Sequence, residues 1–421
     1  MEYAAYRSDV APVEVQVALF QGGDGPVEGH LLIAPTGSAD AATQTEWISR
    51  AYRDALARHE LGTGAALFRR FFCSDLVNQA EILSAHPLAS RTAPDEPCAV
   101  SWVEQPPAPP AQVSLWAYHV RDPAGSLEKL LDGAARPGDA TLTWRRNGRA
   151  HCWTTGISGA ANMPGVAAPR STEPATNALA GGASAGDVVA QTRCAFEQYA
   201  ALLRAHGLTL ARDAVRTWVF VRDIDANYAG MVAARRAYFR EIGLTPQTHF
   251  IASTGVAGTG PDPRARVTLD AYAIGGLQPG QVSYLAAPDH LGPTHAYGVT
   301  FERGTAIAYR DRTHLLISGT ASIDPRGAVL YPHDVARQLE RTLDNIDALL
   351  GPAGATFADA AALIAYVREP RDLKLVQDRI RVRCGGVPVA VVVAPICRSG
   401  WLVEVEAVGV LPGTKPDLPI F

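Results

Sequence analysis

The sequence lacks the patterns by which common enzyme and binding-protein classes are recognised. Its six cysteines are far apart and form no C-x-x-C pair, which argues against structural zinc and against a disulfide framework. None of the eleven histidines belongs to an H-E-x-x-H motif, and there is neither a Walker loop nor a strand-linked G-x-G-x-x-G. We therefore expect no metal and no cofactor.

Long apolar runs and blocks of like charge are also missing. No run reaches the length of about eighteen residues that a membrane span needs, and the segment beginning Met1-Glu2-Tyr3 lacks the features of a signal peptide. The 38 basic and 42 acidic residues are scattered, with no cluster to bind a phosphate backbone or a lipid surface. We expect a soluble cytoplasmic protein without nucleic-acid or membrane partners.

What the sequence does contain is an internal repeat. Residues 187–203 and 334–350 both predict an amphipathic helix that begins with aspartate. Each is followed by a glycine-containing turn and a strand that ends in Val-Arg, at Arg222 and at Arg368. The spacing from aspartate to arginine differs by only one residue, and self-similarity of this kind is a stronger signal than any single motif.

The match extends in both directions and includes a weaker first copy. The hairpins at 146–159 and 310–322 correspond, and so do the closing strands at 268–275 and 402–409. The first copy runs through 14–20, 30–37, 45–59, 68–75 and 113–120. Each copy predicts a β-β-α-β-(α)-β-β unit of the α/β (α+β) class, with helices covering one face of a largely antiparallel sheet.

These copies divide the chain into three expected domains, 1–135, 136–287 and 288–421. The second contains an insert at 159–186 that is rich in glycine, alanine and proline. A passive linker and a lid over an active site are both open interpretations of this insert.

The order of these elements resembles the Rid (YjgF-like) unit of the chorismate mutase-like fold, which usually assembles as a homotrimer. Three copies in one chain would form a pseudo-trimer. The last two copies more narrowly resemble the chorismatase family, in the segments 216–225, 234–239, 252–255, 297–304, 318–323 and 397–406. The resemblance implies a lyase that releases pyruvate from chorismate.

The closing strand of the third copy carries the candidate acid. Strand alternation places Glu404 and Glu406 on one face, where mutual repulsion would raise a pKa and leave one carboxyl protonated. Such a group could protonate an enolpyruvyl methylene as a general acid, and by resemblance to chorismatases Glu404 is that acid. The alternative is that both glutamates face solvent at a sheet edge.

The substrate would be a dicarboxylate, which calls for guanidinium groups able to bind it. Arg303, Arg368 and Arg398 are the candidates, and the glycine of the loop Ser318-Gly319-Thr320 permits close backbone approach. Tyr297 lies in the same family-like segment as Arg303. Each arginine could instead be an ordinary surface residue.

Two further positions bear on the product. Cys397 together with Gly304 resembles the chorismatase subtype that forms 3-hydroxybenzoate, whereas the hydrolytic subtype, which forms a dihydroxycyclohexadiene carboxylate, tends to carry alanine at both positions. A polarizable thiol and a small residue would reshape the pocket and exclude water. The alternative is that Cys397 only packs.

Two other function classes are compatible with the repeat. A Rid-like imine or enamine deaminase, or another acid-catalysed hydrolase or cyclase, would keep the fold. The Rid pattern, however, has an arginine in the strand that here reads 387–393 and contains none. A non-catalytic ligand-binding or scaffold protein would not need the two glutamates that only the third copy has. We expect a monomer that acts as a pseudo-trimer.

Overall fold

The computed structural model describes residues 1–23, 25–90, 97–125, 127–133, 140–160, 185–413 and 415–421. They form three six-stranded mixed sheets, each with its own pair of long helices. The insert expected at 159–186 lies outside the described residues except at its ends. No described helix is both long and apolar enough to cross a bilayer.

The three sheets share one topology, in which the sixth strand of each unit is inserted between its third and fourth. The first sheet has the order β1 (Glu2–Arg7), β2 (Val13–Gln21), β3 (Val27–Pro35), β6 (Val113–Arg121), β4 (Ala66–Cys73), β5 (Ala99–Glu104). The second has β7 (Lys129–Gly133), β8 (Ala140–Arg146), β9 (Arg149–Ser158), β12 (Val267–Gly275), β10 (Ala214–Val221), β11 (Ala252–Ala257). The third has β13 (Val282–Tyr284), β14 (Gly304–Ala308), β15 (Arg312–Ala321), β18 (Val403–Pro412), β16 (Ala360–Val367), β17 (Val389–Val393).

Every unit has one helix after its third strand and another between its fourth and fifth strands. They are α1 (Ala41–Arg58) and α2 (Leu76–Ala85), then α3 (Ala185–Ala205) and α5 (Ile224–Glu241), then α6 (Val335–Leu350) and α7 (Leu373–Cys384), with a short α4 (Leu210–Asp213). Asp40, Asp75 and Asp334 cap α1, α2 and α6 by accepting a backbone N–H of the first turn. The second helix of each pair is the crossover between two parallel strands.

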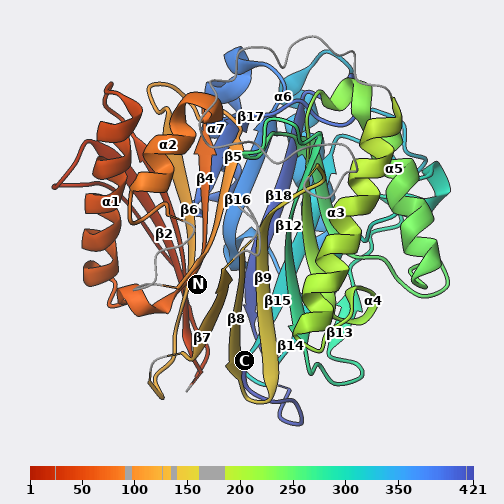
Figure 1. The fold of residues 1–421 in the computed structure, drawn as a ribbon, viewed down its shortest axis with the longest axis horizontal. Coiled ribbons are helices and arrows are strands. Elements are labelled where there is room, and N and C mark those ends of the chain that lie inside the picture. The colour runs from red at the N-terminus through yellow and green to blue at the C-terminus, as the bar shows by residue number, and fades with distance from the viewer. Residues whose placement is uncertain (24, 91–96, 126, 134–139, 161–184, 414) are drawn as a thin grey trace.

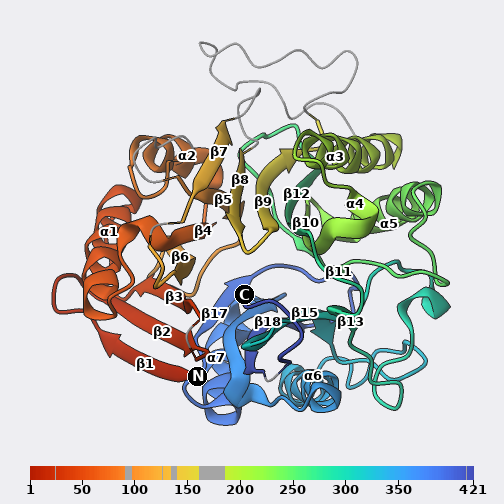
Figure 2. The same ribbon diagram turned by 90° about the horizontal axis from the view of Figure 1, so that it is seen from below.

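The units surround a common axis, with the sheets inside and the helices outside (Figures 1 and 2). The largest apolar cluster draws side chains from all three sheets, including Trp116, Trp218 and Leu316. Three copies of one topology around an axis confirm the predicted repeats, the α+β class and the pseudo-trimer.

Each unit has one strand more than the sequence predicted. The additional strands are the edge strands β1, β7 and β13, which are short and partly exposed and so carry little apolar signal. Because β7 and β13 belong to the second and third sheets, these sheets begin at Lys129 and Val282, before the expected boundaries at 135 and 288. The division of the chain into domains 1–135, 136–287 and 288–421 stays a prediction.

A buried arginine–carboxylate pair joins the units at every boundary. Arg70 of the first unit donates to Asp270 of the second at 2.9 Å, and Arg216 of the second donates to Glu406 of the third at 2.7 Å. Arg312 of the third unit pairs with Glu28 of the first at 2.5 Å. The side chains are at most 2% exposed, so each charge depends on its partner across the boundary.

We predict that Asp270→Asn lowers the free energy of unfolding by about 3–5 kcal/mol, because the isosteric amide leaves the charge of Arg70 buried and unpaired. The matched control is Glu241→Gln, which removes a charge from the exposed pair with Arg193 and should cost less than about 1 kcal/mol. Urea denaturation measures both values. Equal costs would show that the buried pair does not hold the boundary.

Candidate active site

The boundary between the second and third units contains the candidate site. Here the edge strand β11 lies against β14 and β15 of the third unit, and Ala252 forms an isolated parallel bridge with Glu302. The backbone N–H of Ser253 donates to the hydroxyl of Ser318 at 2.9 Å. Residues from two units therefore share the walls of one cleft.

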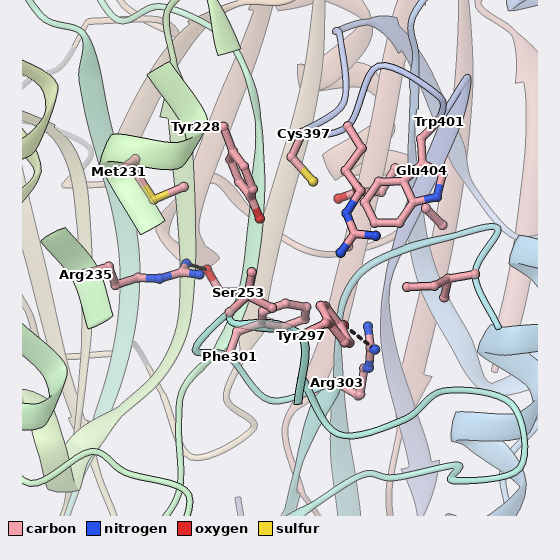
Figure 3. Close-up of a pocket in the computed structure, with 16 residues that line it drawn as sticks. Tyr228, Met231, Arg235, Ser253, Tyr297, Phe301, Arg303, Cys397, Trp401 and Glu404 are labelled. Carbon is pink, nitrogen blue, oxygen red and sulfur yellow. Dashed lines mark hydrogen bonds between the residues drawn. The ribbon is translucent and has the colours of Figure 1, made fainter. Parts of the chain in front are cut away.

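The pocket in this cleft has about 550 Å³ of space between its walls, part of it open to solvent. Figure 3 shows its side chains converging from α5, from β11, from the loop before β14 and from the segment leading into β18. Its polar lining residues are Tyr228, Arg235, Ser253, Tyr297, Arg303, Cys397, Arg398 and Glu404. Met231, Gly255, Val299, Phe301, Gly319, Ala321, Ile323 and Trp401 complete the wall.

Glu404 is the one carboxylic acid among the lining residues. It lies on β18, a central strand, opposite Ala321 on β15 and Tyr366 on β16, and is 4% exposed. Burial and the neighbouring charge of Glu406 raise the pKa of Glu404 to about 8, against the opposing effect of Arg216 and Arg303. The raised pKa agrees with the expectation, and the alternative of a solvent-facing edge is wrong because β18 has neighbours on both sides.

Gly319 provides the room in which the Glu404 carboxyl sits. Ser318 and Gly319 form a bulge in β15, where the pairing register with β18 shifts between Ile317 and Thr320. A Cβ on Gly319 would lie 2.9 Å from Cδ of Glu404 and 3.1 Å from the methyl group of Thr254. A side chain at this position would displace the acid.

Glu406 lies behind the pocket wall rather than in it. One of its oxygens accepts from Trp218 Nε1 at 2.8 Å, and the other accepts from Arg216 at 2.7 Å and from the hydroxyl of Thr254. No hydrogen bond to the Glu404 carboxyl comes from the described residues. The two glutamates thus share a strand face, but only Glu406 has a counterion and a full set of donors.

Three guanidinium groups face the pocket without a carboxylate partner among the described residues. Arg235 donates to Ser253 at 3.3 Å and keeps an unpaired buried Nε, and Arg303 donates to the Gly292 carbonyl at 3.0 Å and to the Tyr297 hydroxyl. Arg398 donates to the Gly327 carbonyl at 2.6 Å and lies over the ring of Trp401. Burial lowers the pKa of Arg235 and of Arg303, and the neighbouring groups, which for Arg303 include Tyr297 and Glu404, do not offset this effect.

The remaining polar groups keep their protons. Burial and the charge of Glu404 raise the pKa of the Cys397 thiol to about 12, although a hydrogen bond with Tyr228 opposes the shift. Burial likewise raises the pKa of Tyr228 well above its usual value. Cys397 is therefore a thiol and not a thiolate nucleophile. No group of three or more potential metal ligands occurs in the described parts of the chain.

The structure brings together six of the residues singled out from the sequence, namely Tyr297, Arg303, Gly319, Cys397, Arg398 and Glu404. Five others are outside the lining: Gly304, Ser318, Thr320, Arg368 and Glu406. Ser318 and Thr320 flank Gly319 in the bulge, where their hydroxyls donate to the carbonyls of Glu302 and Ser318.

Arg368 and Gly304 have supporting positions. Arg368 pairs with Asp225 at 2.8 Å and donates to the carbonyls of Ile396, Arg398 and Trp401, so it braces the loop that carries the pocket residues. A Cβ on Gly304 would meet Leu285 at 3.0 Å and Ile317 at 3.3 Å. Arg368 and Gly304 therefore support the walls of the pocket without lining it.

Sequence reasoning missed one wall of the pocket. Tyr228, Met231 and Arg235 are spaced three and four residues apart, and α5 directs all three into the cleft (Figure 3). The sequence feature that could have identified this wall is the helical spacing of the three large residues in α5. An arginine at such a position is usually a surface residue, and only the packing of α5 beside the cleft shows otherwise.

A solved structure matches most of this chain. The chain superposes on the crystal structure of a chorismatase with a TM-score of 0.58 and 20% sequence identity, over 91% of this chain and 99% of that chain. The chain has the fold of that chorismatase.

Smaller proteins match about 30% of this chain. A putative endoribonuclease L-PSP from Entamoeba histolytica has 18% identity and a TM-score of 0.27, over 31% of this chain and 99% of its own. The Rid-family protein YyfA from Yersinia pestis has 21% identity and a TM-score of 0.26, over 30% and 98%. No protein-family model and no curated protein matches the sequence.

We predict that the contribution of Glu404 to the free energy of unfolding falls between about pH 4.5 and pH 8. The folded protein keeps the Glu404 proton that the unfolded chain loses near its ordinary pKa of 4.5, so the folded state is favoured below that pH and loses this advantage as the pH rises to about 8. The slope from this one proton is at most about 1.4 kcal/mol per pH unit.

Glu404→Gln is the matched control, because the amide cannot ionise. Urea denaturation from pH 5 to pH 9 should show the stability of the variant rising relative to that of the wild type up to about pH 8, and then a constant difference. Parallel pH dependences of the two proteins would contradict a buried, protonated Glu404.

Proposed function

We propose that the protein is a chorismatase-type lyase that releases pyruvate from chorismate and leaves 3-hydroxybenzoate. The observation that carries the proposal is the pairing of one buried, protonated carboxyl with three guanidinium groups that lack a carboxylate partner in the described structure. This constellation occupies the cleft between two units of a chorismatase fold.

The charges of the pocket suit a dianion. Chorismate carries two carboxylates, and Arg235, Arg303 and Arg398 offer N–H groups for charge-assisted hydrogen bonds. Buried cations without counterions are costly, so binding a dicarboxylate would relieve an existing penalty. Tyr297, Phe301 and Trp401 supply apolar and aromatic surface for the ring of the substrate.

The chemical step assigned to Glu404 is protonation of the enolpyruvyl methylene. The proton converts the methylene to a methyl group and leaves an oxocarbenium ion. Its ether bond to the ring then breaks, the electron pair leaves with pyruvate, and the oxygen of the neighbouring ring hydroxyl bonds to the vacated ring carbon. Cleavage of the bond from this oxygen to its original carbon and loss of a ring proton give 3-hydroxybenzoate. A pKa of about 8 keeps the acid protonated at neutral pH while leaving it strong enough to donate. The same carboxylate can accept a proton later in the cycle.

The fate of the ring depends on water. Pyruvate and 3-hydroxybenzoate together contain the atoms of chorismate, whereas pyruvate and a dihydroxycyclohexadiene carboxylate contain one additional water. A lining of aromatic rings and a protonated thiol favours the first outcome, because neither of these groups is a base that could activate a water for attack on the ring. The resemblance of Cys397 and Gly304 to the 3-hydroxybenzoate subtype points the same way.

The remaining parts of the proposal follow from this chemistry. The reaction is redox-neutral, so we propose that it needs no cofactor. We further propose that the protein works as a monomeric pseudo-trimer in the cytoplasm and that its product enters secondary metabolism.

We predict that the purified protein converts chorismate to pyruvate and 3-hydroxybenzoate in equal amounts. Glu404→Gln should lower the rate by at least about a hundredfold, because the amide cannot donate the proton. Glu340→Gln on the exposed face of α6 is the matched control and should be fully active. Coupled pyruvate detection and chromatography of the aromatic product measure both. No turnover by the folded wild-type protein would refute the function, and a diene diol would refute the subtype.

We also predict that Arg235→Met raises the KM for chorismate by about 10- to 100-fold, the value of one charge-assisted hydrogen bond to a carboxylate. Arg193→Met removes an exposed arginine from the neighbouring helix α3 and should leave KM unchanged. Steady-state kinetics with chorismate measure the KM of both variants. An unchanged KM in Arg235→Met would remove this residue from the binding site.

A further inference from the structure

The hydroxyl of Thr254 lies where the second and third units meet behind Glu404. Thr254 is on the edge strand β11 and is 1% exposed. Its oxygen accepts from Arg216 at 2.6 Å and from the backbone N–H of Gly319 at 2.9 Å, and its O–H donates to Glu406. The hydroxyl therefore uses its single donor and both acceptor positions.

Two of these three partners determine the surroundings of the acid. Gly319 forms the bulge against which the Glu404 carboxyl lies, and Glu406 is the neighbouring charge that helps to raise the pKa of Glu404. The Thr254 hydroxyl of the second unit thus binds both the Gly319 bulge and the Glu406 carboxylate, the two groups of the third unit that surround Glu404. Thr254 itself does not line the pocket.

The boundary between the first and second units has equivalent residues, but there the glycine N–H does not donate to a hydroxyl. Ser101 occupies the position of Thr254 and donates to Asp270 at 2.5 Å, beside Arg70. Gly156 occupies the position of Gly319, but its backbone N–H donates directly to the Asp270 carboxylate at 2.8 Å. At this boundary the glycine N–H donates to the carboxylate itself and not to a hydroxyl.

The comparison shows what Thr254 changes. Its hydroxyl accepts the Gly319 N–H, whereas the equivalent Gly156 N–H donates to Asp270, the counterpart of Glu406. In the third unit the Glu404 carboxyl also lies beside Gly319, so it is a second acceptor within reach of this N–H. A backbone N–H donated to Glu404 would favour its charged form and lower its pKa. The position of Glu404 is occupied by Thr268 in the second sheet, so no acid there needs this protection.

We propose that Thr254 is a positioning residue that acts across the unit boundary, holding the Gly319 N–H and the Glu406 carboxylate in the arrangement in which Glu404 keeps its proton. The consequence for catalysis rests on the proposed function. The arrangement itself does not.

The test compares Thr254→Val, which has the same shape but no hydroxyl, with Thr254→Ser, which restores the hydroxyl. Ser101→Ala is the matched control, because it breaks the equivalent bond at the boundary where Thr268 occupies the position of Glu404. The pH dependence of kcat/KM for chorismate is measured for each, together with thermal stability. The alkaline limb of kcat/KM reports the acid of the free enzyme.

We expect the alkaline limb of Thr254→Val to move down from about pH 8 by at least about one unit, which corresponds to a roughly fivefold lower kcat/KM at pH 8 and approaches tenfold at higher pH. The rate at pH 6 and the KM should stay within about threefold of the wild type, since Thr254 does not touch the pocket. Thr254→Ser should restore the limb, and Ser101→Ala should lower stability without moving it. A limb that stays in place in a folded Thr254→Val would overturn the proposal.

A carboxyl titration separates this proposal from the proposed function. Carbon-13 NMR of protein labelled at the glutamate δ-carbon, with Glu404 assigned from Glu404→Gln, measures the ionisation of the acid without any substrate. If the wild type does not turn over chorismate, the function fails while this titration still decides the role of Thr254. Thr254→Ala makes the same prediction and replaces Thr254→Val if that variant does not fold.

Discussion

A guanidinium buried against the carboxylate of a neighbouring unit is the interaction on which the remaining structure depends. Such pairs add little net stability, but each loses several kcal/mol if either charge is displaced, so they admit only one relative placement of the units. The pairs Arg70–Asp270, Arg216–Glu406 and Arg312–Glu28 apply this constraint at all three boundaries. The edge strand β11 is consequently fixed against β15, where the cleft requires it.

The same constraint separates the two glutamates of β18. Arg216 forms an ion pair with Glu406. Glu404, two residues away on the strand, has no such partner among the described residues and is buried beside the Glu406 carboxylate. Titratable groups in contrasting environments are the usual source of acid–base chemistry at neutral pH. The pair that fixes the placement of these two units therefore also includes the carboxylate that helps to raise the pKa of Glu404.

The sequence predicted what local periodicity encodes. Aspartates before amphipathic runs gave the helices, internal similarity gave three units, and alternation placed Glu404 and Glu406 on one face. Periodicity does not encode which side of a helix faces a neighbouring unit, so Arg235 was missed. It also could not show that Arg368, just beyond the end of β16, turns to Asp225 instead of to the pocket.

The three sheets carry different residues at the position of Glu404. Glu404 pairs with Tyr366, and the corresponding residues of the other sheets are Thr268 opposite Phe220 and Ser114 opposite Phe72. In a homotrimer any substitution would appear in every cleft, and loss of the acid would abolish all three sites. Three units in one chain remove this coupling, because the first unit can lose its acid and still supply Arg70 and Glu28 to its neighbours. Covalent linkage thus allows one boundary to specialise for chemistry while the other two hold it in place.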